Sequence, residues 1–225
     1  MKSKMLFMVM VDVGPAAIED EFNSWYNDEH VPELLRVPGF LIARRFRVIN
    51  GQPRYAALYD LADISALGEP LFHQARPAHP KSTPATKRMW PHVRNLRRGT
   101  YIQFARYRIA AGIDSTEASH LLLVGVELAP GGEPAFCRWY TKGHLPRLAG
   151  TPELLGAGCY TLDPRGTDHK DPPGQGLLLY EFAGVQAADA SFGDLPARTN
   201  TRNLYERIYL ARSPIAMNRG LSSPA

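Results

Sequence analysis

A four-residue pattern that occurs twice in this chain constrains its fold more than any other feature. The pattern is Trp-Tyr, three residues, His, one residue and Pro. Its two copies, which lie 114 residues apart, are Trp25, Tyr26, His30 and Pro32, and Trp139, Tyr140, His144 and Pro146. Tryptophan and histidine are rare residue types, so four identities at a fixed spacing indicate a tandem duplication.

Weaker matches around the motif extend this duplication over most of the chain. Residues 11–15 resemble residues 126–130, and residues 57–61 resemble residues 178–182. The segment 111–116 between the halves has the composition of a turn. The predicted divisions are a first module at 1–112 with a basic, Pro-rich excursion at about 75–98, a second module at 118–215, and a tail at 216–225.

Hydrophobic periodicity predicts the same order of elements in both halves. Asn50-Gly51 between two apolar runs is a hairpin turn signal. In the first half we expect strands at 6–13, 40–48, 55–61 and 100–109, with helices at 20–35 and 64–73. In the second half we expect strands at 120–128, 154–162, 176–182 and 204–211, with a helix at 134–149 and a short one before the last strand.

The order strand, helix, strand, strand, helix, strand is that of the split βαβ, ferredoxin-like unit. Its antiparallel sheet carries helices on one face only, so the other face needs cover. We therefore expect an α+β protein in which two tandem ferredoxin-like modules place their sheets face to face. This packing would close a barrel within one chain and leave an apolar pocket between the sheets.

Residues 21–32, 37–40 and 54–59 together resemble the EthD-like branch of the dimeric α+β barrel superfamily. The resemblance covers most of the first half, whereas the second half has Lys142-Gly143 where the first has Asp28-Glu29. It implies a barrel of two ferredoxin-like units, here fused. Relatives include cofactor-independent monooxygenases, polyketide cyclases, muconolactone isomerases, haem-degrading enzymes, dye-decolorising peroxidases and proteins with no assigned role. The resemblance therefore implies a small hydrophobic ligand rather than one reaction.

His30 is the residue that we expect to carry chemistry, because an imidazole both takes and gives protons near neutral pH. We expect Asp28 to orient His30, and Tyr26 or an arginine to stabilise negative charge on a substrate oxygen. In the alternative interpretation, His30 and His144 are capping residues that complement the helix dipole at two equivalent helix ends.

Further residues are expected to contact the substrate, although for the tryptophans a core position is the favoured interpretation. An arginine that points inward needs a carboxylate, phenolate or carbonyl partner. The predicted substrate-binding residues are Trp25, Arg44, Tyr59, Arg106, Tyr140 and His144.

These features predict a cofactor-independent enzyme of lyase, isomerase, cyclase or oxygenase type. It would act on a small aromatic, phenolic or lactone-like compound by His-mediated acid/base chemistry. The alternatives are a non-catalytic EthD-like binding or accessory protein and a haem-binding protein. No metal site is predicted, because the seven histidines are scattered and no two are four residues apart. Haem bound through a single histidine remains an alternative.

Charge and composition limit the kinds of partner, and the cellular location, that we expect for this protein. Between residues 70 and 112 there are nine basic and no acidic residues, which indicates a solvated or partner-facing basic surface, with an anionic substrate or interface as the alternative. This stretch contains no known groove-entering motif, so nucleic acid is not expected. The apolar run 5–11 is too short for a membrane span or signal peptide. Two cysteines form no disulfide framework and fit the cytoplasm. A homodimer stays open.

Overall fold

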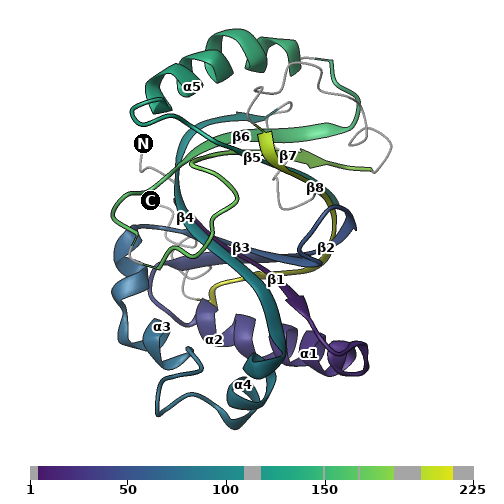
Figure 1. The fold of residues 1–225 in the computed structure, drawn as a ribbon, viewed down its shortest axis with the longest axis vertical. Helices are drawn as coiled ribbons and strands as arrows, with labels where there is room; N and C mark the ends of the chain where they lie inside the picture. Colours follow the sequence, from purple (N-terminus) through teal and green to yellow (C-terminus); the bar gives the residue numbers. More distant parts are fainter. Residues whose placement is uncertain (1–4, 109–117, 149, 167, 185–198, 215–225) are drawn as a thin grey trace, which may run out of the picture.

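Eight strands form one closed antiparallel barrel in the computed structural model (Figure 1). The structure describes residues 5–108, 118–148, 150–166, 168–184 and 199–214. Around the barrel the order is β1, β3, β2, β8, β5, β7, β6 and β4, which pairs again with β1. The strands are β1 (Met5–Val13), β2 (Phe40–Asn50), β3 (Tyr55–Leu61), β4 (Val93–Arg108), β5 (His120–Val126), β6 (Leu154–Leu162), β7 (Gly176–Phe182) and β8 (Thr199–Arg212).

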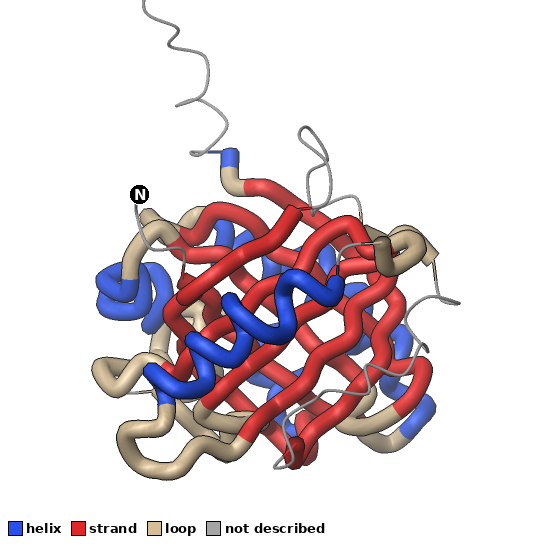
Figure 2. Tube along the Cα trace, turned by 90° about the horizontal axis from the view of Figure 1, so that it is seen from above, coloured by secondary structure: helices blue, strands red, loops and turns tan. Residues whose placement is uncertain are grey.

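Short helices cover two opposite sides of the barrel, with α1 to α4 on one side and α5 on the other (Figure 1). From the α5 side, the strands run obliquely beneath that helix (Figure 2). Each described helix is too short or too polar to cross a bilayer. The α-helices are α1 (Glu19–Trp25), α2 (Val31–Leu35), α3 (Pro70–Gln74), α4 (Pro84–Met89) and α5 (Glu133–Trp139). The other helical turns are η1 (Ala16–Ile18), η2 (Tyr26–His30), η3 (Ile64–Gly68), η4 (Trp90–His92), η6 (Tyr140–His144) and η7 (Leu145–Leu148).

Two long strands close the barrel. The first part of β4 pairs with β1 from Val93 onward, and its last part pairs with β6. In the same way, β8 pairs with β5 through its first part and with β2 through its last part. Strands of 16 and 14 residues are long enough to bridge both halves of the chain in this way. All eight strands therefore have two hydrogen-bonded neighbours.

The predicted fold class, an α+β protein of two tandem ferredoxin-like modules, is wrong for this structure. The eight strands belong to one continuous hydrogen-bonded barrel, and the longest described α-helices have only seven residues. The physical reason is the extra length of β4 and β8, which joins strands of both halves into one ladder. The short helix expected before the last strand lies outside the described residues.

Alternation along the strands fills both sides of the barrel wall. Leu6, Met8 and Met10 of β1 point into a packed interior, whereas Phe7 and Val11 pack outward against the helices of the first half. The interior cluster includes Phe46, Leu58, Tyr101, Leu123, Leu179 and Tyr205. The apolar pocket of the first half lies outside the barrel, between the barrel wall and the helices, and not between two sheets as expected.

Candidate active site

A cavity of about 540 Å³ lies between the outer face of the barrel and the helices of the first half. This volume is within the range of small-molecule sites, about 300–1,000 Å³. Phe7, Val9 and Val11 of β1 line it, together with Leu34 of α2 and Phe72 of α3. The described lining is mostly apolar and includes no aspartate or glutamate. The cavity therefore suits an apolar or aromatic molecule.

The basic, Pro-rich excursion supplies one wall of this cavity, through residues 75–80 and Trp90. The excursion is fastened to α1, because the Trp25 indole Nε1 donates a hydrogen bond of 3.2 Å to Thr86 Oγ1. Thr83 caps α4 and also donates to the carboxylate of Glu29. The excursion is thus a structural part of the pocket.

A further wall comes from the second half of the chain. The connection between β6 and β7 (green in Figure 1) reaches the first half, where Lys170 pairs with Arg98 of β4. Arg98 N donates to Lys170 O at 2.7 Å, and Lys170 N donates to Arg98 O at 2.9 Å. These bonds bring Lys170 and Arg98 to the cavity lining. Both halves therefore build the site.

His30 reaches the cavity because the helix around it is widened into a π turn. Pro32 has no N–H with which to continue α-helical bonding, and Val31 N–H instead bonds to Tyr26 O, five residues back. The wider turn stacks the His30 ring on Trp25, with centroids 4.9 Å apart and an interplanar angle of 23°. The Tyr26 ring meets His30 edge-on at 5.0 Å. The imidazole is thus held from two sides, 9% exposed, and lines the cavity.

A carboxylate lies beside this imidazole. Glu33 Oε2 is 3.9 Å from His30 Nδ1. Both atoms are buried and have no hydrogen-bond partner in the structure, so a small rotation would join them. A carboxylate at Nδ1 fixes the imidazole tautomer and leaves Nε2 as the reactive nitrogen.

Two tyrosines and an arginine form the polar group next to His30. Tyr59 Oη donates to Tyr26 Oη at 3.3 Å, and both tyrosines line the cavity. The Arg45 guanidinium lies 4.0 Å from the centre of the Tyr26 ring. Burial raises the pKa of Tyr26, and the charge of Arg45 partly opposes that rise. Both phenols stay protonated at neutral pH, because burial also raises the pKa of Tyr59.

Two residues expected near the substrate are placed elsewhere. Asp28 is exposed, and its charge acts on Tyr209 of β8. The carboxylate near His30 is therefore that of Glu33, not of Asp28. Trp25 is buried in the core as the partner of His30 and Thr86, and it is not among the residues that line the cavity.

The second motif copy has the same backbone but different side-chain partners. Leu145 N–H bonds to Tyr140 O across the π turn η6, and His144 stacks on Trp139 at 4.8 Å. His144 Nε2 lies 2.7 Å from Tyr180 Oη. Tyr140 and His144 are buried, and neither lines the cavity around His30.

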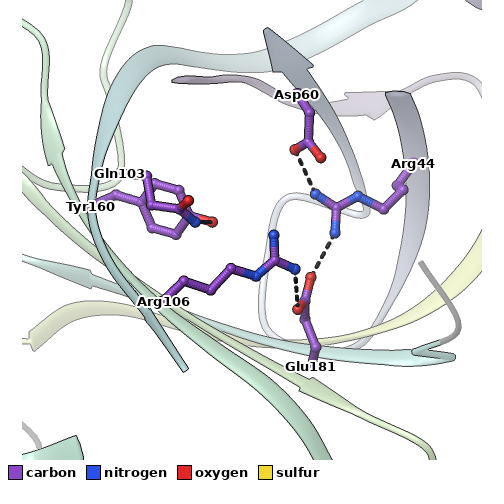
Figure 3. A network of polar contacts seen from close by, with 6 residues as sticks. All are labelled: Arg44, Asp60, Gln103, Arg106, Tyr160 and Glu181. Carbon is purple, nitrogen blue, oxygen red and sulfur yellow. Dashed lines mark hydrogen bonds and ion pairs between the residues drawn. The ribbon is translucent and has the colours of Figure 1, made fainter. Parts of the chain in front are cut away.

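Arg44 and Arg106 point into the barrel, where each meets a carboxylate (Figure 3). Arg44 donates to Glu181 Oε1 at 2.6 Å and to Asp60 Oδ1 at 2.8 Å. Arg106 donates to Glu181 Oε2 at 3.0 Å. Burial disfavours the charge of Arg44, but Asp60 and Glu181 outweigh it and raise its pKa. This network ties β2, β3, β4 and β7 together and lies apart from the cavity lining.

Several residues of the site were not identified from the sequence. Glu33 follows His30 by three residues, a spacing that places two helical side chains together and could have indicated it. Arg76 and Arg98 were noted only as part of the basic run, and Lys170 lies in a connection with no pattern of its own. Only tertiary packing brings Arg76, Arg98 and Lys170 together at the cavity.

His30 is the residue that would hold a haem at this site. An imidazole that ligates iron is oriented by an acceptor at its other nitrogen, and Glu33 beside Nδ1 would supply that acceptor. Among the described residues, no group of three or more His, Cys, Asp or Glu side chains is placed to hold a metal ion.

No protein-family model and no curated protein matches the sequence of this chain. Solved structures do match its fold. An anthrone oxidase-like protein superposes with a TM-score of 0.69 at 9% identity, covering 96% of this chain and 95% of that one. A candidate monooxygenase from Lactobacillus acidophilus gives 0.56 at 11% identity, over 94% and 97% of the chains.

A mutant chlorite dismutase from Candidatus Nitrospira defluvii, in complex with cyanide, has a TM-score of 0.52 at 11% identity. It covers 93% of this chain and 92% of its own. At 9–11% identity, these likenesses establish a shared fold and nothing further. The resemblance to the dimeric α+β barrel superfamily, its EthD-like branch and the tandem duplication stay predictions.

Proposed function

We propose that this protein is an enzyme that removes a proton from an activated carbon of a small aromatic or phenolic compound bound in the outer cavity. One observation supports this proposal above all others. The buried imidazole of His30 lines an apolar cavity, and a carboxylate oxygen of Glu33 lies 3.9 Å from its Nδ1. Cofactor-independent lyase, isomerase, cyclase and oxygenase reactions can each begin with such a step. Fold neighbours described as oxidase-like and as a monooxygenase add support for an enzymatic role.

His30 acts as the general base in this proposal. Its Nε2 takes the proton from a carbon made acidic by a neighbouring carbonyl or aromatic ring. Glu33 is a positioning residue: its Oε2 lies 3.9 Å from Nδ1, and a rotation of the side chain would let it accept the Nδ1 proton and keep the ring in one orientation. The resulting imidazolium, flanked by Trp25 and Glu33, returns its proton at the end of the reaction.

Tyr26 stabilises the negative charge that forms on the substrate oxygen. Its hydroxyl accepts a hydrogen bond from Tyr59, so its own proton is free for donation into the cavity. The Arg45 cation over the Tyr26 ring makes that hydroxyl a stronger donor. Removing one such donor typically costs about 10²–10³ in rate.

The test is exchange of the acidic carbon-bound proton with D₂O, followed by NMR for a panel of phenolic ketones, unsaturated lactones and anthrone-type compounds. We expect exchange catalysed by the wild-type protein and a loss of about 100-fold or more in His30→Ala, as for other general bases. His120→Ala removes an imidazole outside the cavity and should leave exchange unchanged. Equal rates in His30→Ala and wild type would contradict the proposal.

Two other outcomes would identify the alternatives. Tight binding of panel compounds without any exchange would favour a non-catalytic binding or accessory protein. A Soret band that shifts on titration with haemin, and that is lost in His30→Ala, would favour a haem protein with His30 as the axial ligand.

A further inference from the structure

We propose that the substrate carries a carboxylate, which binds to Arg76, Arg98 and Lys170 at the cavity. This inference deepens the proposed function by naming a substrate class, aromatic carboxylates, and shares its site. The three cations come from separate parts of the chain: Arg76 follows α3, Arg98 lies on β4, and Lys170 lies in the β6–β7 connection. Packing therefore brings three positive charges to one apolar cavity.

One carboxylate outside the lining holds two of these cations in place. Asp168 Oδ1 accepts a hydrogen bond of 2.6 Å from Arg76 Nη2 and another of 2.6 Å from Arg98 Nη2. Arg98 Nε also donates to the Asp168 backbone oxygen at 2.7 Å. Asp168 thus offsets the repulsion between the guanidiniums and fixes their orientation, while each guanidinium keeps further N–H donors.

The charge balance at this wall stays positive. Arg76, Arg98 and Lys170 carry three positive charges against the single negative charge of Asp168, and the described cavity lining contains no carboxylate. The Arg98 side chain is only 16% exposed, so its charge acts on the cavity with little screening by water. A carboxylate on the substrate would balance this charge.

The apolar part of the cavity fits the rest of such a molecule. Phe7, Phe72 and Tyr59 pack together, with the Phe7 centroid 5.7 Å from that of Phe72 and 5.9 Å from that of Tyr59. An aromatic ring on these side chains gains their edge and face contacts. The same molecule then meets Tyr26 and His30, which line the same cavity.

The experiment compares 2-naphthoate with its neutral amide, 2-naphthamide, by quenching of tryptophan fluorescence, since Trp90 lines the cavity. We expect 2-naphthoate to bind at least tenfold more tightly to the wild-type protein. Lys170→Gln should weaken 2-naphthoate binding about three- to tenfold and leave 2-naphthamide unchanged, because Lys170 is exposed and its contribution is partly screened. Arg98→Gln should weaken it more, at an unchanged far-UV circular dichroism spectrum.

Lys142→Gln is the matched control, because Lys142 lies in η6 and does not line the cavity. The inference is overturned if naphthoate and naphthamide bind equally, if neither binds, or if Lys142→Gln weakens naphthoate as much as Lys170→Gln does. Preferential naphthoate binding together with His30-independent proton exchange would instead contradict only the proposed function.

Discussion

The two Trp-Tyr…His-Pro segments have one backbone design and two different uses. In both, a proline after the histidine opens a π turn, and the histidine stacks on the tryptophan at nearly the same distance, 4.9 Å for His30 and 4.8 Å for His144. The difference lies in a tyrosine on the strand beneath. Tyr180 bonds to His144 Nε2, whereas Tyr59 bonds to Tyr26 and leaves His30 for the cavity.

The surroundings of the two turns diverge in the same direction. Arg45 lies over the Tyr26 ring and bonds to the side-chain amides of Asn23 and Asn27. The corresponding position in the second half of the chain is Cys159. Glu33 beside His30 corresponds to Arg147. A shared backbone thus carries a polar, cavity-facing arrangement at His30 and a closed hydrogen-bonded one at His144. The comparison teaches that the motif itself specifies a ring stack, and that its neighbours specify chemistry.

The strongest test of the difference between the two segments is to replace each histidine in turn. His30→Ala should lower turnover by about 10²–10⁴, because it removes the general base, and should lower stability less than His144→Ala, because His30 has no counterpart of the bond between His144 and Tyr180. His144→Ala should lower the free energy of unfolding by about 2–4 kcal/mol, because it removes a buried ring and its 2.7 Å hydrogen bond with the Tyr180 hydroxyl. Urea unfolding and turnover of both variants test this.

If both variants lost stability equally and kept equal turnover, the two histidines would be structural residues of the same kind. That result would return the interpretation to two helix-end histidines.

The next largest effect concerns Arg45 and Cys159. Arg45 donates to Asn23 Oδ1 at 2.9 Å and to Asn27 Oδ1 at 2.5 Å, besides its contact with Tyr26. Arg45→Met should therefore lower the free energy of unfolding by about 2–4 kcal/mol, since hydrogen bonds to charged groups are worth about 1.5–3 kcal/mol. Cys159→Ala should lower it by only about 1 kcal/mol, for the small volume lost. Denaturant unfolding measures both, and equal losses would contradict the assigned role of Arg45.

The smallest effect separates Glu33 from Arg147. Glu33→Gln should lower kcat about tenfold and change KM little, since it removes the acceptor that orients His30 (about 1.4 kcal/mol). Arg147→Gln should leave kcat and KM unchanged. An unchanged kcat in Glu33→Gln would show that Glu33 does not act on His30.

Much of the strand pattern could be predicted from the sequence. The expected strands at 55–61, 154–162 and 176–182 coincide with β3, β6 and β7, because apolar runs between clear turn residues define them. The start of β4 was missed. Arg94, Asn95 and Arg97 give its first part the composition of a polar loop, and only pairing with β1 makes it a strand.

The location of the cavity could not be predicted for a related reason. Both faces of β1 are buried, one by the barrel interior and the other by helices, so alternation along residues 5–11 does not distinguish them. His30 and Tyr26 were identified because they belong to a repeated motif. Arg98 and Lys170 meet only through the pairing of β4 with a distant connection, which leaves no trace in local spacing.

The closed ladder of strands has a consequence for how copies of this protein can meet. Because each of β1 to β8 already has a neighbour on either side, the backbone donors and acceptors of the sheet are satisfied internally. An added strand from another chain would find no free edge on the described barrel. Contacts between copies through the described residues would therefore be made by side chains, for example the exposed Phe104 of β4 and Ile49 of β2, and not by pairing of strands.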